Sequence, residues 1–260
     1  MPLLEFKNVD KTFLVGEREI TAIDRLSLSI EEHEFVSIVG PSGCGKSTFL
    51  HIVGGFESSS GGDLLLRGKP IGPPGPDRGM MFQEFSLFPW KTALENVAWP
   101  LEIKGLPKAE RIAKAREYLD LVHLSRYGDL YPAQLSGGMK QRVALARLFA
   151  LDPEVLLMDE PFGALDSQTR ELLQEELQSI WRRTRKTALF VTHDIDESIY
   201  LATRLIVFTA RPGRIKADIR IPEIDRSGEF RKSKEYLDLR VQVWDLVREE
   251  VLKARALEEA

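Results

Sequence analysis

The fold of this 260-residue chain is constrained most by a set of short apolar runs. Each run ends close to residues that are candidates for ligand binding or catalysis. Four such runs occur, at residues 35–39, 80–82, 155–158 and 188–191. Continuous apolar runs separated by helical segments are typical of parallel strands that are covered on both faces. The residues that follow the four runs are Gly40, Gln83, Asp159 with Glu160, and His193. Because ligands bind beyond the carboxyl ends of strands in open α/β sheets, the pattern predicts one functional edge.

The rest of the chain divides into segments with other patterns. Alternating residues at 26–30 predict an antiparallel strand with one face in solvent. The helical pattern that begins after Gln83 predicts a helical lobe, and the charge-rich C-terminal part ends in an amphipathic helix. The apolar face predicted for that helix carries Leu237, Val241, Trp244, Val247 and Val251. We therefore expect an α/β core from 1–83 and 152–215 with an N-terminal β subdomain, a helical subdomain at 84–151 and a C-terminal extension at 216–260.

Composition and charge exclude several classes of protein. Hydrophobic residues make up 43% and charged residues 29% of the chain, which is typical of a globular protein with a buried core. The formal net charge of −4 indicates no overall attraction to nucleic acid or anionic membranes. A single cysteine, Cys44, excludes an intramolecular disulfide framework and fits a reducing compartment. We find neither a secretory signal nor 18 consecutive apolar residues, so we do not expect the chain to span a bilayer by itself.

Residues 40–47, GPSGCGKS, fit the pattern G-x-x-x-x-G-K-[ST] between a predicted strand and an apolar helical stretch, the context that this motif requires. Glycines let backbone N–H groups surround phosphate oxygens, and the following helix N-terminus adds partial positive charge. We expect Lys46 to reach the β- and γ-phosphates and Ser47 to offer its hydroxyl to Mg²⁺. The residues predicted to bind nucleotide are Gly40, Pro41, Ser42, Gly43, Cys44, Gly45, Lys46, Ser47 and Thr48. Since Cys44 lies inside this loop, we expect alkylation of its thiol to block ATP binding.

The run at 155–158 supplies the second half of a nucleotide-hydrolysing site. A strand that ends in Asp159 can hold Mg²⁺ beside the phosphates, and the following Glu160 can orient and polarise water. Taken alone, an apolar run before two acids is also typical of a strand capped by surface carboxylates. Its combination with the phosphate-binding pattern favours nucleotide hydrolysis.

Residues 135–142, LSGGMKQR, resemble the signature of ATP-binding-cassette (ABC) ATPases, and the order of the surrounding motifs resembles that family too. The resemblance covers almost the whole chain and implies a P-loop α/β fold of ABC type, with a mainly parallel sheet, an antiparallel β subdomain and a helical subdomain. It also implies a head-to-tail homodimer that encloses two ATP molecules with Mg²⁺. In that dimer the signature residues of one copy close over the γ-phosphate held by the other copy. In this sequence the matching residues are Leu135, Ser136, Gly137 and Gly138. The chain departs from the commonest signature at Met139, where the family usually has glutamine.

Other functional positions of the family match this sequence residue by residue. The resemblance implies that Glu160 is the catalytic glutamate, that His193 contacts the γ-phosphate and that Gln83 contacts Mg²⁺ and the attacking water. It assigns Asp166 to a loop at the dimer interface. Phe13 resembles the aromatic residue that stacks on adenine, although its position is equally consistent with a core residue. The implied catalytic residues are Lys46, Gln83, Glu160 and His193, and the implied metal ligands are Ser47, Gln83 and Asp159.

Two segments, 83–90 (QEFSLFPW) and 210–215 (ARPGRI), look like those of nitrate, sulfonate and taurine importer ATPases. In that family the first segment helps to form a groove that receives a short helix of a membrane subunit. The resemblance therefore implies separate transmembrane permease subunits, an extracytoplasmic solute-binding protein and a place on the cytoplasmic face of the membrane. The imported solute would be a small oxyanion such as a sulfonate, taurine or nitrate. The aromatic residues here are equally consistent with core packing, and they are Phe82, Phe85, Phe88 and Trp90.

Two other functions compete with import. A soluble ABC ATPase that acts on nucleic acid or the ribosome usually has two cassettes or long coiled-coil insertions, and this sequence shows neither, so we expect no nucleic-acid partner. A regulatory cassette that does not hydrolyse ATP would be expected to have lost part of the site. Its main members are all present: Lys46, Asp159, Glu160 and His193.

Overall fold

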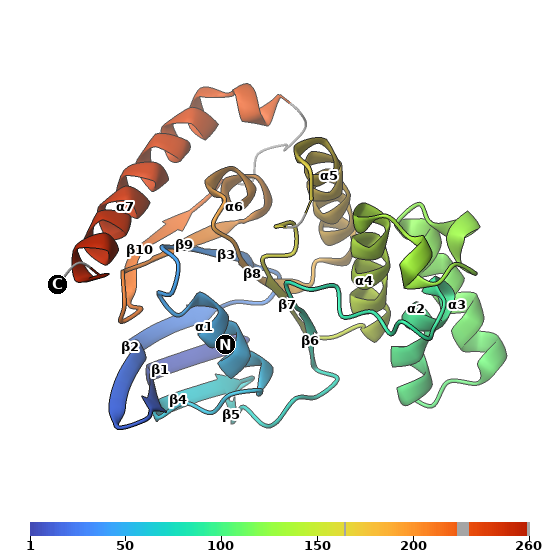
Figure 1. Cartoon of the computed structure of the whole chain (residues 1–260), viewed down its shortest axis with the longest axis horizontal. Helices are drawn as coiled ribbons and strands as arrows, with labels where there is room; N and C mark the ends of the chain where they lie inside the picture. Colours follow the sequence, from blue (N-terminus) through green and yellow to red (C-terminus); the bar gives the residue numbers. More distant parts are fainter. Residues whose placement is uncertain (164, 223–228, 259–260) are drawn as a thin grey trace. The chain divides into compact units, whose positions relative to one another are not determined.

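The computed structural model describes residues 1–163, 165–222 and 229–258 (Figure 1). Within these residues the chain has a mixed α/β fold, as predicted. Its contacts divide it into two compact units, which we call unit 1 (Met1–Gly75 with Thr187–Ala260) and unit 2 (Pro76–Lys186). The three-part division expected from the sequence has other boundaries and stays a prediction.

An antiparallel sheet forms the N-terminal part of unit 1. Its strand order is β2-β1-β4-β5, and the strands are β1 (Leu4–Val15), β2 (Arg18–Ile30), β4 (Gly61–Leu66) and β5 (Lys69–Pro70). Residues 26–30 of β2 alternate between buried and exposed positions, so one face of this strand lies on the core. The antiparallel strand predicted there is confirmed.

A mainly parallel sheet forms the rest of the core of unit 1, with the strand order β10-β9-β3-β8. The strands β3 (Phe35–Val39), β8 (Thr187–Val191) and β9 (Arg204–Phe208) run parallel and are buried throughout, while β10 (Ile215–Arg220) pairs antiparallel with β9. The helices of unit 1 are α1 (Lys46–Gly54), α6 (Ile195–Leu201) and α7 (Lys234–Glu258), with the 3₁₀ turn η3 (Phe230–Lys232). Strands buried on both faces explain the unbroken apolar runs in the sequence.

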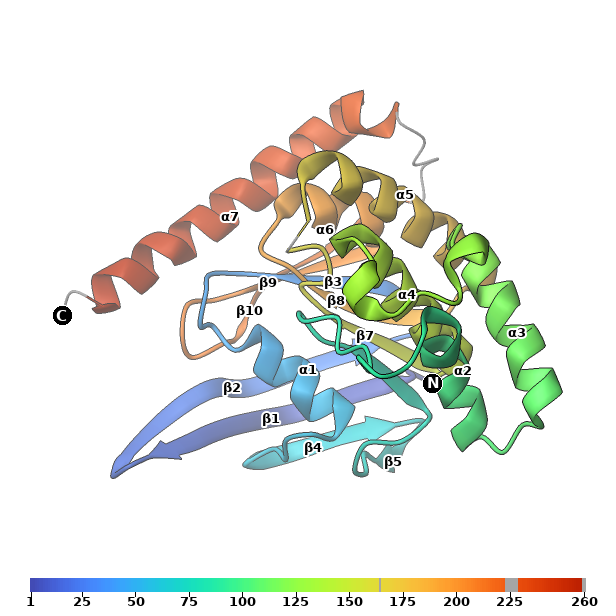
Figure 2. The same ribbon diagram turned by 45° about the vertical axis from the view of Figure 1, so that its right-hand side comes forward.

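Unit 2 combines a short parallel strand pair with a group of helices. Strands β6 (Arg78–Met81) and β7 (Val155–Asp159) pair in parallel, with Met81 opposite Met158. Helices α2 (Ala93–Ile103), α3 (Lys108–Leu121) and α4 (Gly137–Leu151) pack on one another, and α5 (Ser167–Thr184) packs on α4 (Figure 2). The 3₁₀ turns η1 (Ser125–Tyr127) and η2 (Pro132–Gln134) connect α3 to α4. The helical lobe expected from the sequence is thus present, beginning at α2.

Helix α7 is present, and the apolar face identified in its sequence is only partly buried. Val247 and Val251 are half-buried, whereas Leu237, Val241 and Trp244 are exposed. The side chains that α7 buries are those of Tyr236, Val243 and Glu250, which lie seven residues apart and form a neighbouring stripe of the helix. The strongest apolar stripe in the sequence is therefore not the one that packs on unit 1. No helix among the described residues is long and apolar enough to cross a lipid bilayer.

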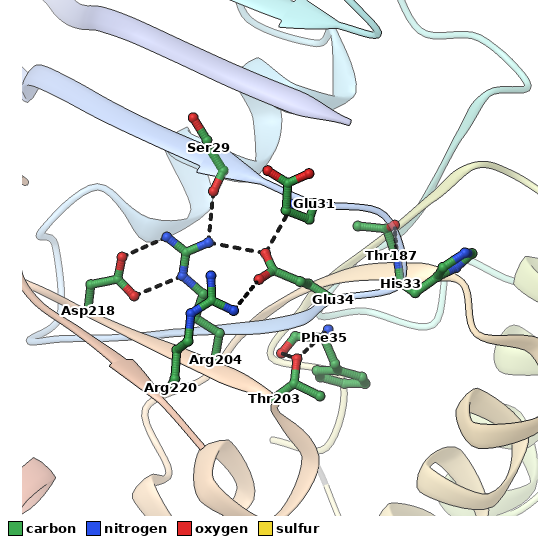
Figure 3. Close-up of polar contacts among 10 residues, drawn as sticks. All are labelled: Ser29, Glu31, His33, Glu34, Phe35, Thr187, Thr203, Arg204, Asp218 and Arg220. Carbon is green, nitrogen blue, oxygen red and sulfur yellow. Dashed lines mark hydrogen bonds and ion pairs between the residues drawn. The ribbon is translucent and has the colours of Figure 1, made fainter. Parts of the chain in front are cut away.

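A partly buried ion-pair network joins β9 and β10 to the end of β2 in unit 1 (Figure 3). Arg204 donates hydrogen bonds to both carboxylate oxygens of Asp218, at 2.8 and 2.6 Å, and to Glu34 Oε2 at 3.1 Å. It also donates to the carbonyl oxygen of Ser29 at 2.7 Å, and Arg220 contacts Glu34 Oε1 at 3.1 Å. The hydrogen bonds to Asp218 raise the pKa of Arg204 and lower that of Asp218, so both groups are charged at neutral pH.

Replacing Arg204 by alanine is expected to lower the free energy of unfolding by about 3 kcal/mol, because Glu34 would remain buried without its main partner. Chemical denaturation of the full chain measures the loss. Arg220→Ala is a suitable control, because Arg220 contacts the same carboxylate with a side chain that is 73% exposed, and it should cost less than about 1 kcal/mol. Equal losses in the two variants would contradict this account of the network.

Candidate nucleotide-binding site

The predicted phosphate loop lies in unit 1 between the end of β3 and the start of α1. Gly43 and Gly45 have φ angles of +72° and +102°, which non-glycine residues rarely adopt. At Gly45 a Cβ atom would lie only 2.7 Å from the carbonyl oxygen of Ala22, so a side chain does not fit there. The backbone thus requires glycine at position 45, which the sequence pattern specifies, and favours it at position 43, which the pattern leaves open. The loop leads directly into the N-terminus of α1.

Lys46 is the buried cation of this loop. Its side chain is 7% exposed, and Nζ donates hydrogen bonds to the carbonyl oxygens of Gly40 and Pro41, both at 2.9 Å. The ammonium group therefore lies over the loop that begins at Gly40. Ser47 in the first turn of α1 is exposed. A charge held in this way is placed to meet the phosphate groups of a bound nucleotide.

Cys44 occupies a fully buried position within the loop. Burial raises the pKa of its thiol, and the nearby ammonium of Lys46 only partly opposes this effect. Because the thiolate is the reactive form of cysteine, we expect Cys44 to react slowly with alkylating reagents in the folded protein. The expected block of ATP binding by alkylation stays a prediction, although the modification itself should be slow.

His193 follows β8, at the same edge of the unit 1 sheet as the phosphate loop. Strands β3 and β8 are parallel with Ile38 opposite Val191, so their carboxyl ends lie side by side. His193 is exposed, and the residues on either side of it are tightly held. Thr192 Oγ1 donates to Glu197 Oε2 at 2.7 Å and accepts from Asp194 N at 3.0 Å. Unit 1 thus brings together the phosphate loop and His193.

Glu197 is a residue of this site that our sequence interpretation missed. It is 4% exposed, and its carboxylate fixes the turn that presents His193. Its backbone N–H donates to Asp194 Oδ1 at 3.1 Å, which caps α6. An acidic cap residue followed three positions later by glutamate is typical of a helix start. The pair Asp194 and Glu197 could therefore have been recognised in the sequence as the N-terminus of a helix.

Phe13 lies on β1 of unit 1 and is half-buried, which does not support the core alternative. The ammonium group of Lys11 lies 4.6 Å from the centre of its ring. Lys11 is held there by hydrogen bonds to Glu57 Oε2 and to the carbonyl oxygen of Ser58, both at 2.8 Å. An accessible aromatic ring suits stacking on a base. The adenine-binding role of Phe13 stays a prediction.

Asp159 is the last residue of β7, and Gln83 and Glu160 follow the paired strands of unit 2. Because Met81 of β6 lies opposite Met158 of β7, the residues that follow both strands lie at one edge of the pair. Asp159 is 8% exposed, Gln83 is exposed and Glu160 is half-buried. The φ angle of Glu160 is +44°, a value uncommon for a residue with a long side chain and often found at functional sites.

The signature residues of unit 2 begin helix α4. Ser136 is the N-cap residue, and its Oγ accepts a hydrogen bond from Met139 N at 3.3 Å. A Cβ atom at Gly138 would lie 2.7 Å from Thr169 Cγ2 on α5. Asp166 caps α5 by accepting from Thr169 N at 3.0 Å, and this hydrogen bond lowers the pKa of Asp166. Thr169 thus joins the starts of the two helices, so the signature and Asp166 lie together in unit 2.

The predicted Mg²⁺ ligands can be tested by their chemistry. Among the described residues there is no group of three histidine, cysteine or acidic side chains that could hold a metal by itself. Mg²⁺ is usually bound through one or two carboxylates together with substrate phosphates rather than by an all-protein cage. The hydroxyl of Ser47, the amide of Gln83 and the carboxylate of Asp159 are oxygen donors of the required kind. Each of them is a donor of a type that Mg²⁺ accepts, and their shared role as ligands stays a prediction.

Comparison with known proteins identifies the family. The ABC transporter family matches residues 23–163, a range that contains the phosphate loop, the signature and the acidic pair. The chain belongs to the ABC transporter family. An uncharacterized ABC transporter ATP-binding protein of Methanocaldococcus jannaschii is 48% identical over 251 residues, which cover 96% of this chain and 93% of that protein.

Two relatives of this ABC protein have names that state a substrate. The taurine import ATP-binding protein of Rhizobium johnstonii is 45% identical over 232 residues, which cover 87% of this chain and 88% of the relative. The nitrate import ATP-binding protein of a Synechocystis species is 44% identical over 218 residues, which cover 84% of this chain and 82% of the relative.

Solved structures agree with the family assignment. A dimeric bacterial ABC transporter cassette has a TM-score of 0.76 and 37% identity, and the likeness covers 85% of this chain and all of that one. The same cassette has also been solved in a post-hydrolysis state with ADP and Pi, with the same TM-score and identity. The predicted ABC-type fold and the ATPase activity are therefore confirmed.

An apolar groove lies in unit 2 of this ABC ATPase. Its cavity of about 270 Å³ is lined by β6, the segment after it, α2 and α4, and Phe82, Phe88 and Trp99 contribute aromatic rings. The ring of Phe88 lies 4.8 Å from that of Trp99 and 5.6 Å from that of Trp90. Trp90 is 70% exposed and Phe82 37% exposed. The aromatic residues that follow β6 therefore form a surface rather than part of the core.

Arg147 of α4 is a second residue that our sequence interpretation missed. Its guanidinium donates hydrogen bonds to the carbonyl oxygens of Ser86 at 2.7 Å and Phe85 at 3.1 Å, and it lies 5.6 Å from the ring centre of Phe88. Burial lowers the pKa of Arg147 to about 10, so it remains charged at neutral pH. Arg147 thus holds one wall of the groove from a helix far away in the sequence.

Proposed function

We propose that this ABC ATPase is the ATP-hydrolysing subunit of an import system. Two copies would work beneath separate membrane permease subunits on the cytoplasmic face of the membrane, with an extracytoplasmic solute-binding protein on the other side. The observation that carries the proposal is the aromatic groove of unit 2, a concave apolar surface of the kind that can receive the apolar face of a partner helix. The taurine and nitrate import relatives, which match over most of both chains, support the same function.

The proposed reaction gives each of the predicted catalytic residues a role in the hydrolysis of ATP. In unit 1 the loop N–H groups and Lys46 hold the phosphates, and His193 contacts the γ-phosphate. In unit 2 the carboxylate of Glu160 takes a proton from the attacking water. The water oxygen forms a bond to the γ-phosphorus, and the bond between that phosphorus and the β,γ-bridging oxygen breaks. ADP and inorganic phosphate result. Mg²⁺, held by Ser47, Gln83 and Asp159, would neutralise phosphate charge.

The proposed dimer places the signature of one copy over the nucleotide of the other. Ser136, Gly137 and Gly138 begin α4, and a helix N-terminus carries partial positive charge that favours a phosphate group. The dimeric cassette relative supports this assembly. ATP would favour the closed dimer because it binds that state better, and hydrolysis would remove the preference. The resulting motion would reach the permease through the groove.

The transported solute in this proposal is a small oxyanion, with a sulfonate such as taurine as first choice and nitrate as second. The test uses the full chain with an affinity tag, purified from native membranes and reconstituted with its co-purifying proteins. We expect permease subunits in the complex and an ATPase rate that taurine, an alkanesulfonate or nitrate increases in the presence of the binding protein. Co-purification with ribosomes or nucleic acid, and with no membrane protein, would contradict the proposal.

The groove makes a separate prediction about partner binding. Trp90→Ala removes an exposed ring that lies beside Phe88, one of the residues lining the groove. This change is expected to reduce permease co-purification by about tenfold, because aromatic anchors carry much of the energy of such interfaces. Trp244→Ala is a matched control, since Trp244 is 57% exposed on α7 of unit 1. We expect this control to co-purify at the wild-type level. Equal recovery of permease by the Trp90 variant and the wild type would show that the groove is not the docking site.

A further inference from the structure

The turn between β9 and β10, residues 209–214, packs directly against the phosphate loop. A Cβ atom at Gly213 would lie 2.3 Å from the carbonyl oxygen of Cys44 and 3.2 Å from that of Ala22. Gly213 N donates a hydrogen bond to the same Ala22 oxygen at 2.8 Å, and this oxygen also limits the space at Gly45. The backbones touch, so a displacement of the turn must displace the loop.

Two further close approaches join the phosphate loop to the end of β9 and to the turn. A Cβ atom at Gly40 would lie 3.1 Å from the carbonyl oxygen of Phe208, and one at Gly43 would lie 3.8 Å from Arg211 Nη2. The turn is also closed internally, because Thr209 Oγ1 donates to the carbonyl oxygen of Pro212 at 2.8 Å and accepts from Arg214 N at 3.0 Å. The turn therefore supports the phosphate loop at several points and behaves as one piece.

Helix α7 holds this turn through the buried carboxylate of Glu250, which is 2% exposed (Figures 1 and 2 show α7 beside β9 and β10). Glu250 Oε2 accepts a hydrogen bond from Ala210 N at 2.9 Å. Its Oε1 contacts Lys216 Nζ at 2.9 Å and Lys253 Nζ at 2.7 Å. Ala210 lies near the start of the turn and Lys216 lies just beyond its end on β10, so one carboxylate contacts the chain at both ends of the turn.

Glu250 carries its charge at neutral pH. Burial opposes ionisation, but the hydrogen bonds from Lys253, Ala210 N and Lys216 outweigh it and hold the pKa of Glu250 at about 2. A buried charge that contacts several donors is weak as a source of stability, because an apolar side chain of similar volume often packs equally well. What an apolar side chain cannot do is accept the hydrogen bond from Ala210 N.

We propose that Glu250 is a positioning residue for ATP binding: from α7 it fixes the β9–β10 turn, and the turn in turn keeps the phosphate loop in its nucleotide-binding shape. This inference rests on the proposed use of the phosphate loop for ATP. It assigns the C-terminal helix a direct effect on nucleotide affinity, through contacts that all lie within unit 1.

The test compares Glu250→Ala and Glu250→Gln with Glu249→Ala in the full chain. Glu249 is a matched control because it contacts the same Lys216 at 2.5 Å from an exposed position on the same helix. We expect Glu250→Ala to weaken ATP binding without Mg²⁺ by about tenfold, with kcat at saturating ATP within about twofold of wild type. Glu250→Gln keeps an acceptor for Ala210 N, so its ATP affinity is expected to lie about midway, on a logarithmic scale, between those of the wild type and Glu250→Ala. Glu249→Ala is expected to change ATP affinity by less than about twofold.

Cys44 provides an independent readout, because it is the only cysteine of the chain and its carbonyl oxygen touches Gly213. Its reaction with a disulfide reagent such as dithiobis(nitrobenzoate), in the absence of ATP, reports how often the loop opens. We expect Glu250→Ala to speed this reaction by about tenfold and Glu249→Ala to leave it unchanged. The two readouts together separate a loosened phosphate loop from a general loss of stability.

A lower melting temperature of Glu250→Ala, with ATP affinity and Cys44 reactivity at wild-type values, would show that Glu250 is only structural and would overturn the proposal. If Glu250→Ala does not fold, the same two measurements are made on Glu250→Gln. Wild-type ATP affinity together with wild-type Cys44 reactivity in that variant would overturn the proposal. A wild-type chain that does not bind ATP would overturn the proposed function, and with it this inference, whatever the Cys44 rates are.

Discussion

Replacing Glu160 by glutamine is expected to lower steady-state ATP hydrolysis to less than about a hundredth of the wild-type rate and to leave ATP affinity within about threefold of wild type. Glutamine has the shape of glutamate and can adopt the same backbone at the end of β7, but its amide cannot accept a proton from the attacking water. Phosphate release at saturating ATP measures the first effect. Calorimetric titration with ATP in the absence of Mg²⁺ measures the second.

The matched control for this variant is Glu154→Gln. Glu154 is an exposed residue that immediately precedes β7, so its replacement removes a carboxylate at the opposite end of the same strand. We expect the control to hydrolyse ATP at the wild-type rate. A Glu160→Gln variant that retains more than about a tenth of the wild-type rate would remove Glu160 from its proposed role as the base.

Replacing Lys46 by alanine is expected to weaken ATP binding by about a hundredfold or more and to abolish turnover at ordinary ATP concentrations. Two losses combine in this variant. The phosphates lose a buried positive charge, and the loop loses the hydrogen bonds from Nζ to the carbonyl oxygens of Gly40 and Pro41. The same calorimetric titration measures the effect, and thermal denaturation verifies that the variant is folded.

Lys46→Arg provides the informative comparison. Arginine keeps the charge, but its planar guanidinium is bulkier than an ammonium group and does not suit the buried position of Lys46, which is 7% exposed. We expect an affinity between those of the wild type and the alanine variant. If Lys46→Ala binds ATP as tightly as the wild type, residues 40–47 are not the nucleotide-binding loop.

Much of the fold was predictable because its strands are local apolar patterns. The run at 35–39 is strand β3 residue for residue, and the run at 188–191 lies within β8. The run at 80–82 overlaps β6 only in part, since that strand begins at Arg78, a charged residue that is 7% exposed. A buried arginine gives no apolar signal, so the start of β6 was missed.

The phosphate loop was the most predictable part of the site, because its constraints are local. The positive φ angle of Gly45 falls on a glycine that the motif itself specifies, and that of Gly43 falls on a glycine within the same eight residues. The need for glycine at position 213 is different, since it arises from the carbonyl oxygen of Cys44, which is far away in the sequence. A pattern within one segment cannot contain a contact that only the folded chain creates.

The C-terminal helix shows the same limit. Its amphipathic pattern predicted a helix, but the face it buries includes Glu250, whose burial is compensated by partners on another element such as Ala210 and Lys216. Hydrophobicity alone favours the stripe that contains Trp244. The groove in unit 2 was likewise predictable only in part, because two of its residues, Trp99 and Arg147, come from two separate helices.

The most direct test of the account measures ATP binding and phosphate release in parallel for the wild type, Glu160→Gln and Lys46→Ala. We expect a crossed pattern: Glu160→Gln binds ATP like the wild type but releases less than about a hundredth as much phosphate, whereas Lys46→Ala fails in both measurements. If the two variants instead lose binding and turnover in the same proportion, or if neither loses turnover, the roles assigned to Glu160 and Lys46 are wrong.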